Sequence, residues 1–193
     1  MSLVSKALLG RVARRNPATD AKRQLREFAV KSFKSTATFD VFLSHRYFDA
    51  DQILALKSLI EGFGFSVFVD WIEIPGLDRG KVTKETADYL RQAMNKSASL
   101  LYAVSDHSSD SKWMPWELGY SDALHGQVAV IPITDQETTS ESYGGQEYLG
   151  LYPYLTIARD TTGAENLWIN ETRSTYTSLE NWLEGTAPTY HSS

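Results

Sequence analysis

The chain has 193 residues, of which 42% are hydrophobic and 22% are charged, with no cysteine and a formal net charge of −5. This length suits one domain with a short extension and excludes a multi-domain machine. Without cysteine there is no disulfide framework, thiolate zinc site or cysteine nucleophile, which suits a reducing, cytoplasmic location. No apolar run approaches the roughly 18 residues that cross a bilayer, so we expect a soluble protein without a transmembrane segment.

Positive charge is concentrated at the N-terminus. Residues 1–38 contain nine Lys or Arg and two acidic residues, a net charge of +7, whereas the rest of the chain has ten basic and 22 acidic residues, a net charge of −12. Pro17 separates two helix-like segments, 2–15 and 21–33, because proline begins or ends helices. We expect a basic helical extension outside the main fold, which is either simply solvated or contacts anionic lipid, nucleic acid or the protein's own acidic face.

From Phe39 onward, short apolar runs alternate with amphipathic stretches, a pattern typical of parallel strands covered by helices. The predicted strands are rich in β-branched and aromatic residues and cover 39–44, 65–70, 99–104, 128–133 and 154–158. Apolar residues at helical spacing predict helices over 49–62, 83–95, 113–125 and 177–184. The sequence therefore predicts an α/β domain with five parallel strands.

Several motifs that would indicate a known chemistry are absent or misplaced. Gly62-Phe63-Gly64 precedes a predicted strand and lacks a third glycine, so it is interpreted as a tight turn instead of a dinucleotide-binding loop. The polar segment 134–150 is expected to be a long surface loop. No zinc-protease, serine-hydrolase or P-loop motif occurs, and the four histidines are too scattered to indicate a metal site.

Ligands of parallel sheets bind beyond the carboxyl ends of the strands, and three segments point to that end. Residues 39–45 (FDVFLSH) are a buried strand with a polar tip, residues 70–80 (DWIEIPGLDRG) are a loop with proline and glycine, and residues 111–118 (SKWMPWEL) open a helix. In this order and at these distances, they resemble the TIR (Toll/interleukin-1 receptor/resistance) domain. They match its first box, its BB loop and the S-K-W-x-x-x-E-L motif of its enzymatic bacterial members.

The resemblance implies a flavodoxin-like three-layer fold with a five-stranded parallel sheet over residues 38–185. The basic helical extension would then cover 1–37, and a flexible tail would cover 186–193. The resemblance also implies cleavage of NAD⁺, as in Thoeris-like antiphage defence, with the glutamate of the third motif at Glu117. NAD⁺ would be the substrate, and no cofactor is expected.

The chemistry of NAD⁺ cleavage is compatible with a single carboxylate. Neutral nicotinamide leaves from a cationic pyridinium, so no general acid is required, unlike in two-carboxylate glycosidases. Glu117 would bind the ribose hydroxyls and stabilise an oxocarbenium-like transition state, while water or the adenine of the same molecule attacks. Pro115 is tolerated only in a helix's first turn, so Glu117 is expected near the positive end of that helix, which favours the ionised carboxylate.

The resemblance also suggests substrate-binding residues, each with a structural alternative. Trp113 precedes Glu117 by four residues and either stacks on the pyridinium or packs its helix on the sheet. The position of Phe42 in a central strand favours a role in the core. His45 either caps the next helix or touches ligand. Trp71 would contact ligand or a neighbouring subunit. Tyr47 completes the set of candidates.

Two functions remain open at this point. The first is a TIR-domain NAD⁺ nucleosidase or ADP-ribosyl cyclase that makes ADP-ribose or a cyclic ADP-ribose signal. The alternative is a non-enzymatic adaptor that acts by TIR–TIR assembly, and such adaptors commonly lack the glutamate that is present here. Apolar Ile72, Ile74 and Leu77 in the BB loop predict self-association. Because no second domain is expected, the chain would need either a partner protein, such as a separate effector or sensor, or a diffusible product. No nucleic acid is expected as a partner.

Overall fold

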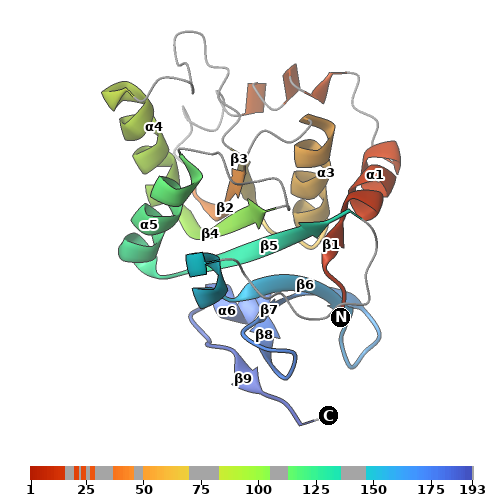
Figure 1. Cartoon of the computed structure of the whole chain (residues 1–193). Helices are drawn as coiled ribbons and strands as arrows, with labels where there is room; N and C mark the ends of the chain where they lie inside the picture. The colour runs from red at the N-terminus through yellow and green to blue at the C-terminus, as the bar shows by residue number, and fades with distance from the viewer. Residues whose placement is uncertain are drawn as a thin grey trace.

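One mixed β-sheet forms the centre of the molecule, with helices on both of its faces (Figure 1). The computed structural model describes residues 1–15, 20–21, 23–24, 27–28, 37–45, 50–69, 83–104, 113–135 and 147–192. Within them, the strands follow the order β3-β2-β4-β5-β6-β7-β8-β9, and β1 pairs with β5. Their bounds are β1 Val4–Ser5, β2 Phe39–His45, β3 Val67–Val69, β4 Ser97–Val104, β5 Val128–Thr134, β6 Tyr154–Arg159, β7 Glu165–Asn170, β8 Thr175–Ser178 and β9 Thr189–Tyr190.

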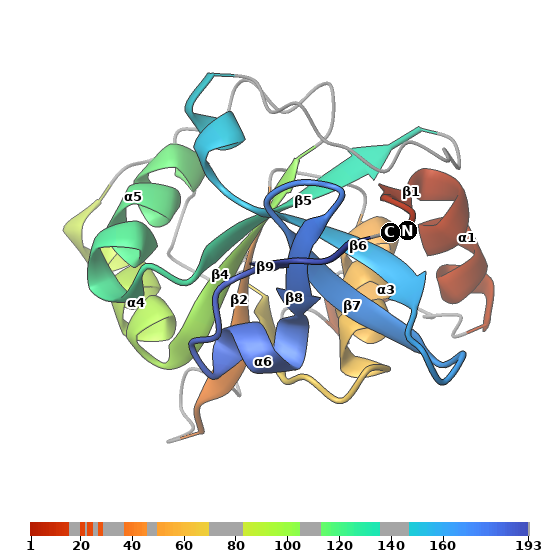
Figure 2. The same cartoon turned by 90° about the horizontal axis from the view of Figure 1, so that it is seen from below.

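The helices divide between the two faces of the sheet (Figures 1 and 2). Helices α1 and α3 cover one face, and α4 and α5 cover the other. Among the described residues, no helix is both long enough and apolar enough to span a membrane. The helix bounds are α1 Lys6–Arg15, α3 Ala50–Glu61, α4 Lys84–Asn95, α5 Met114–His125 and α6 Leu179–Leu183, with a 3₁₀ helix η1 at Glu147–Leu151.

Each face of the sheet carries its own hydrophobic core. The α3-side core contains Val41 and Leu43 of β2, packed with residues of α1 and α3. The α5-side core contains Phe42 of β2, packed with residues of α4 and α5. Consecutive residues of β2 thus alternate between the two cores, as the pleat of a strand buried on both faces requires.

The five predicted strands are confirmed as β2 to β6, and the pairs β2–β3, β2–β4, β4–β5 and β5–β6 are all parallel. The predicted helices 49–62, 83–95 and 113–125 match α3, α4 and α5. The turn predicted at the two glycines is also confirmed, with Gly64 at a φ of +96°. The flavodoxin-like α/β class is therefore confirmed.

The sheet continues beyond the predicted strands through the antiparallel pairs β6–β7, β7–β8 and β8–β9. The carboxylate of Asp160 nucleates the β6–β7 turn by accepting hydrogen bonds from the backbone N–H groups of Thr162 and Ala164, at 2.8 and 3.1 Å. The helix expected over 177–184 begins only at Leu179, because Ser178 ends β8 and caps the helix at the Asn181 N–H (3.2 Å).

The expected separate extension at the N-terminus is not confirmed, because residues 2–5 belong to the sheet. Strands β5 and β6 pair only at Val130 and Tyr154, and the N-terminal segment lies between them beyond that point (Figure 1). Ser2 exchanges two backbone hydrogen bonds of 2.9 Å with Ile157 of β6. Val4 pairs in parallel with Ile133 of β5 and is fully buried. The N-terminus is thus part of the folded domain.

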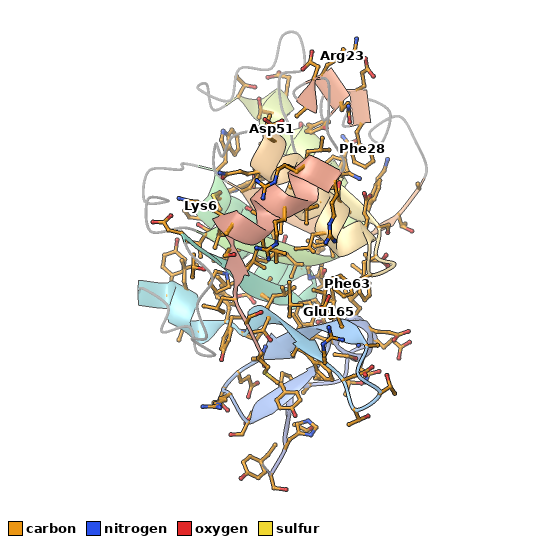
Figure 3. The ribbon with its side chains drawn as sticks, turned by 90° about the vertical axis from the view of Figure 1, so that its right-hand side faces the viewer. Lys6, Arg23, Phe28, Asp51, Phe63 and Glu165 are labelled. Atoms are coloured by element: carbon orange, nitrogen blue, oxygen red, sulfur yellow. The ribbon has the colours of Figure 1, made fainter. Side chains whose placement is uncertain are left out.

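The helical segments after β1 also pack against the body of the protein. Helix α1 buries Leu9 against α3 and leaves Arg11, Arg14 and Arg15 exposed. In the second expected helix the described residues are helical, and the ring of Phe28, which Figure 3 labels, belongs to this segment. The Phe28 ring centroid lies 4.1 Å from the ammonium of Lys57 on α3. Most of the expected surface loop 134–150 lies outside the described residues, and its final part contributes to η1.

Candidate active site

Helix α5 places a glutamate at the carboxyl end of strand β2. Trp113 is the residue before the helix, and Pro115 lies in the first turn, where its missing N–H costs no helical hydrogen bond. The Glu117 N–H donates to the Trp113 carbonyl at 2.8 Å, so Glu117 also belongs to the first turn. The positive end of the helix dipole there favours the ionised carboxylate.

Glu117 lies on the buried face of α5. This face consists of Met114, Glu117, Leu118 and Ser121, whose spacing of three and four residues forms one stripe. The exposed fraction of Glu117 is 0%. Burying an ionised carboxylate costs several kcal/mol unless polar partners compensate it. This position rules out a surface glutamate that merely complements the helix dipole.

A serine hydroxyl from β2 meets this carboxylate inside the protein. The Ser44 Oγ donates to Glu117 Oε2 at 2.6 Å. Ser44 is 1% exposed and lies on the same face of β2 as Phe42, two residues earlier. Sequence reasoning did not include Ser44 among the site residues. The signal in the sequence was a small hydroxyl residue at the carboxyl end of a buried strand, two residues after Phe42 and therefore on the same strand face.

Trp113 adjoins Glu117 and is 6% exposed in the α5-side core. Its ring packs edge-on against Trp116, with 5.6 Å between centroids, and Trp116 stacks on Tyr120 at 5.7 Å. The guanidinium of Arg91, on α4, lies 5.3 Å from the Trp116 ring. These contacts give Trp113 a packing role, next to the candidate catalytic carboxylate.

The two candidates of the first box that the structure describes face opposite sides of the sheet. Phe42 is fully buried in the α5-side core and stacks on Phe68 at 5.7 Å, which favours the core interpretation. His45 is 1% exposed and pairs with Ala103, a residue of the α3-side core. The His45 Nδ1 lies 3.2 Å from the Leu43 carbonyl, which accepts its hydrogen bond. The imidazole is thus on the other face of β2 from Ser44.

The remaining candidates, Tyr47 and Trp71, and the BB loop 71–80 lie outside the described residues. Across the described ranges, no group of three or more His, Asp or Glu side chains is placed to hold a metal ion. What the structure brings together is one buried carboxylate, one hydroxyl and an adjacent aromatic side chain. This arrangement can bind hydroxyl groups and stabilise a developing positive charge.

A flavodoxin-like sheet whose first-box strand meets the glutamate of a W-x-x-x-E helix defines a TIR domain. No protein-family model matches the chain. It is 47% identical over 167 residues to "Probable 3′ cyclic ADP-D-ribose synthase ThsB′" of Bacillus cereus (strain MSX-D12), covering 85% of each chain. It is also 26% identical over 113 residues to TIR2 of Cytobacillus dafuensis, named as a candidate cyclic ADP-D-ribose synthase, covering 58% of this chain and 30% of that protein. The chain therefore belongs to the ThsB′ family of TIR-domain proteins.

Proposed function

We propose that this chain cleaves NAD⁺ and forms a cyclic ADP-ribose, which serves as a signal in antiphage defence. The bond between the nicotinamide nitrogen and the ribose breaks, and neutral nicotinamide leaves with the electron pair. The anomeric carbon then bonds to a nucleophile of the same ADP-ribose, and one proton is released. The observation that carries this proposal is Glu117, placed on the buried face of α5 beside the carboxyl end of β2. The 47% identity to ThsB′ supports the class of product.

Glu117 would act on the ribose. Its carboxylate accepts hydrogen bonds from the ribose hydroxyls and stabilises the positive charge that develops as the glycosidic bond lengthens. No general acid is needed, because nicotinamide leaves as a neutral molecule. Trp113 and Trp71 would offer aromatic faces to the pyridinium, an interaction worth about 0.5 to 2 kcal/mol. Tyr47 remains a proposed substrate contact, whereas the core position of Phe42 and the placement of His45 on the α3 side of the sheet favour structural roles for these two residues. We propose that no cofactor takes part.

The similarity to proteins named as cyclic ADP-D-ribose synthases favours cyclisation over hydrolysis. In such a reaction the site excludes water from the glycosyl intermediate and leaves the internal nucleophile of ADP-ribose as the main competitor. We therefore propose that ADP-ribose is a minor product. The second candidate function, a non-enzymatic adaptor, does not require a charged side chain buried on a helix face.

The test is nicotinamide release by the purified chain and by Glu117→Gln, which removes the charge and keeps the shape. A matched control is Glu85→Gln, because Glu85 is also an acidic first-turn residue but is exposed on α4. We expect a loss of at least about a hundredfold in kcat for Glu117→Gln and no change for Glu85→Gln. Equal turnover by the two variants would remove Glu117 from the mechanism.

Self-association and a separate partner protein complete the proposal. Apolar Ile72, Ile74 and Leu77 suit a contact between neighbouring copies, so specific activity should rise with protein concentration. The substitution Ile74→Asp should suppress this rise without lowering Tm. A specific activity that stays constant on dilution, in protein shown to be monomeric, would refute this part.

The cyclic product would diffuse through the cytoplasm to a separate effector. Cells expressing Glu117→Gln should then lose protection against phage.

A further inference from the structure

We propose that Ser44 is a positioning residue for Glu117. It holds the carboxylate ionised and in one orientation, and it does not itself touch the substrate. This inference rests on the proposed function, because it assigns Ser44 a role in the reaction of Glu117. The observation behind it is the buried hydrogen bond from Ser44 Oγ to Glu117 Oε2.

The backbone of Ser44 is held firmly enough to orient another side chain. Strand β2 lies between β3 and β4, so it is paired along both edges. Ser44 itself is in register with Tyr102 of β4, and its strand neighbours Phe42 and Leu43 are 0% exposed, each in a different core. The hydroxyl therefore projects from a rigid element toward α5. Sites built on strands and helices are positioned more precisely than sites on loops.

The direction of the hydrogen bond follows from the chemistry of the two groups. An ionised carboxylate only accepts, so the Ser44 hydroxyl is the donor. The length of 2.6 Å falls in the range of O–H···O⁻ bonds, which are shorter and stronger than neutral ones. A hydrogen bond to the ionised form of a carboxyl group stabilises its charge, so Ser44 compensates part of the cost of burying Glu117.

The same bond fixes the orientation of the carboxylate. A hydroxyl of fixed position that donates to Oε2 restricts the rotation of the Glu117 carboxyl group. His45, the next residue, cannot take this role, because its side chain lies on the α3 side of the sheet with Ala103.

The substitution Ser44→Ala tests the inference, with Ser99→Ala as a matched control. Ser99 is also 1% exposed, and its hydroxyl donates to the Asp40 carbonyl at 2.7 Å in the same sheet. It is in register with Val41 of the α3-side core, on the face of the sheet opposite Ser44. For Ser44→Ala we expect kcat to fall about ten- to a hundredfold at neutral pH, the usual effect of losing a hydrogen bond to a charged group. We expect Ser44→Thr, which keeps the hydroxyl, to restore most of the rate.

A pH profile separates positioning from a purely structural role. Activity requires ionised Glu117 and is therefore lost at low pH. Ser44 donates only to the ionised form, so without this donor the acidic limb of the activity profile moves to higher pH in Ser44→Ala but not in Ser99→Ala. A rate that falls equally at every pH, or a similar loss in both variants, would overturn the inference. If Ser44→Ala does not fold, Ser44→Cys, a weaker donor, replaces it in the comparison.

A readout without turnover separates this inference from the proposed function. Titration of the Glu117 carboxyl carbon by NMR reports its pKa directly in the wild type, Ser44→Ala and Ser99→Ala. A higher pKa in Ser44→Ala alone supports the positioning role even if the wild type releases no nicotinamide, a result that would refute only the proposed function. An unchanged pKa in Ser44→Ala would overturn the positioning role even if NAD⁺ is cleaved.

Discussion

The substitution Leu9→Ala tests whether the N-terminal segment is part of the folded domain. Leu9 is 1% exposed and packs from α1 into the α3-side core. The change removes three buried carbon atoms, worth about 0.8 kcal/mol each, or about 2.4 kcal/mol in transfer free energy. The cavity left behind raises the loss of unfolding free energy to about 3 kcal/mol. For a chain of this size, we expect Tm to fall by about 6 to 12 °C.

The assay is thermal unfolding followed by circular dichroism, with Arg15→Ala as the control. Arg15 is exposed at the end of α1, so its substitution should move Tm by no more than about 2 °C. A chain that lacks residues 1–15 should be destabilised further, because the pairing of β1 with β5 and the Ser2–Ile157 hydrogen bonds are lost as well. If the Leu9→Ala protein had the same Tm as the wild type, the N-terminal segment would contribute nothing to the stability of the fold.

Three further predictions concern the site and its helix. Glu117→Gln should keep the fold, because it removes the charge without changing the shape of the buried side chain; loss of the cooperative thermal transition would contradict this. Trp113→Ala should lower activity and also cost about 3 kcal/mol or more of stability, whereas lost activity at unchanged Tm would assign the ring to the substrate. Burial lowers the pKa of His125 below 6.5, although Asp122 partly opposes this. The unfolded chain therefore binds more protons between the two pKa values, and stability declines as the pH falls from about 6.5 through the folded-state pKa. His125→Gln should flatten this decline, and identical pH profiles of Tm would refute it.

The central strands and helices were predictable because each carries a strong local pattern. Strands β2, β4 and β5 each contain a continuous apolar run, over 41–43, 100–104 and 128–133, as is typical of strands buried on both faces. Pro115 marks the start of α5 in the sequence, and it correctly places Glu117 in the first turn. In these elements local propensity and tertiary packing favour the same structure, so the sequence alone suffices.

The N-terminal strand was not predictable in the same way. Its two residues, Val4 and Ser5, are too few to show a period, and the basic residues nearby favour a solvated helix. The site for β1 exists only because β5 and β6 diverge after Val130 and Tyr154, which is a property of the folded sheet. Strand β8 ends where Ser178 caps α6, so residues 177 and 178 also carry the sequence signal of a helix start.

The carboxylate of the candidate site was predictable from the sequence, but the side chains around it were predictable only in part. The W-x-x-x-E spacing identifies Glu117, but no local pattern links it to Ser44, 73 residues earlier in the chain. Strand alternation could have separated the candidates of the first box, because Phe42 and Ser44 share one face of β2 and His45 lies on the other. Only the assembled sheet shows which of these faces meets α5.

The most direct test of the proposed function is the product that the purified chain makes from NAD⁺ in water enriched in heavy oxygen. Nicotinamide and the nucleotide product are separated by chromatography, and the mass of the nucleotide is measured by mass spectrometry. We predict nicotinamide together with an equal amount of a nucleotide that lacks one water relative to ADP-ribose and carries no heavy oxygen. This signal should disappear in Glu117→Gln. Labelled ADP-ribose as the main product would contradict cyclisation, and an absence of nicotinamide across the full range of protein concentrations would contradict NAD⁺ cleavage.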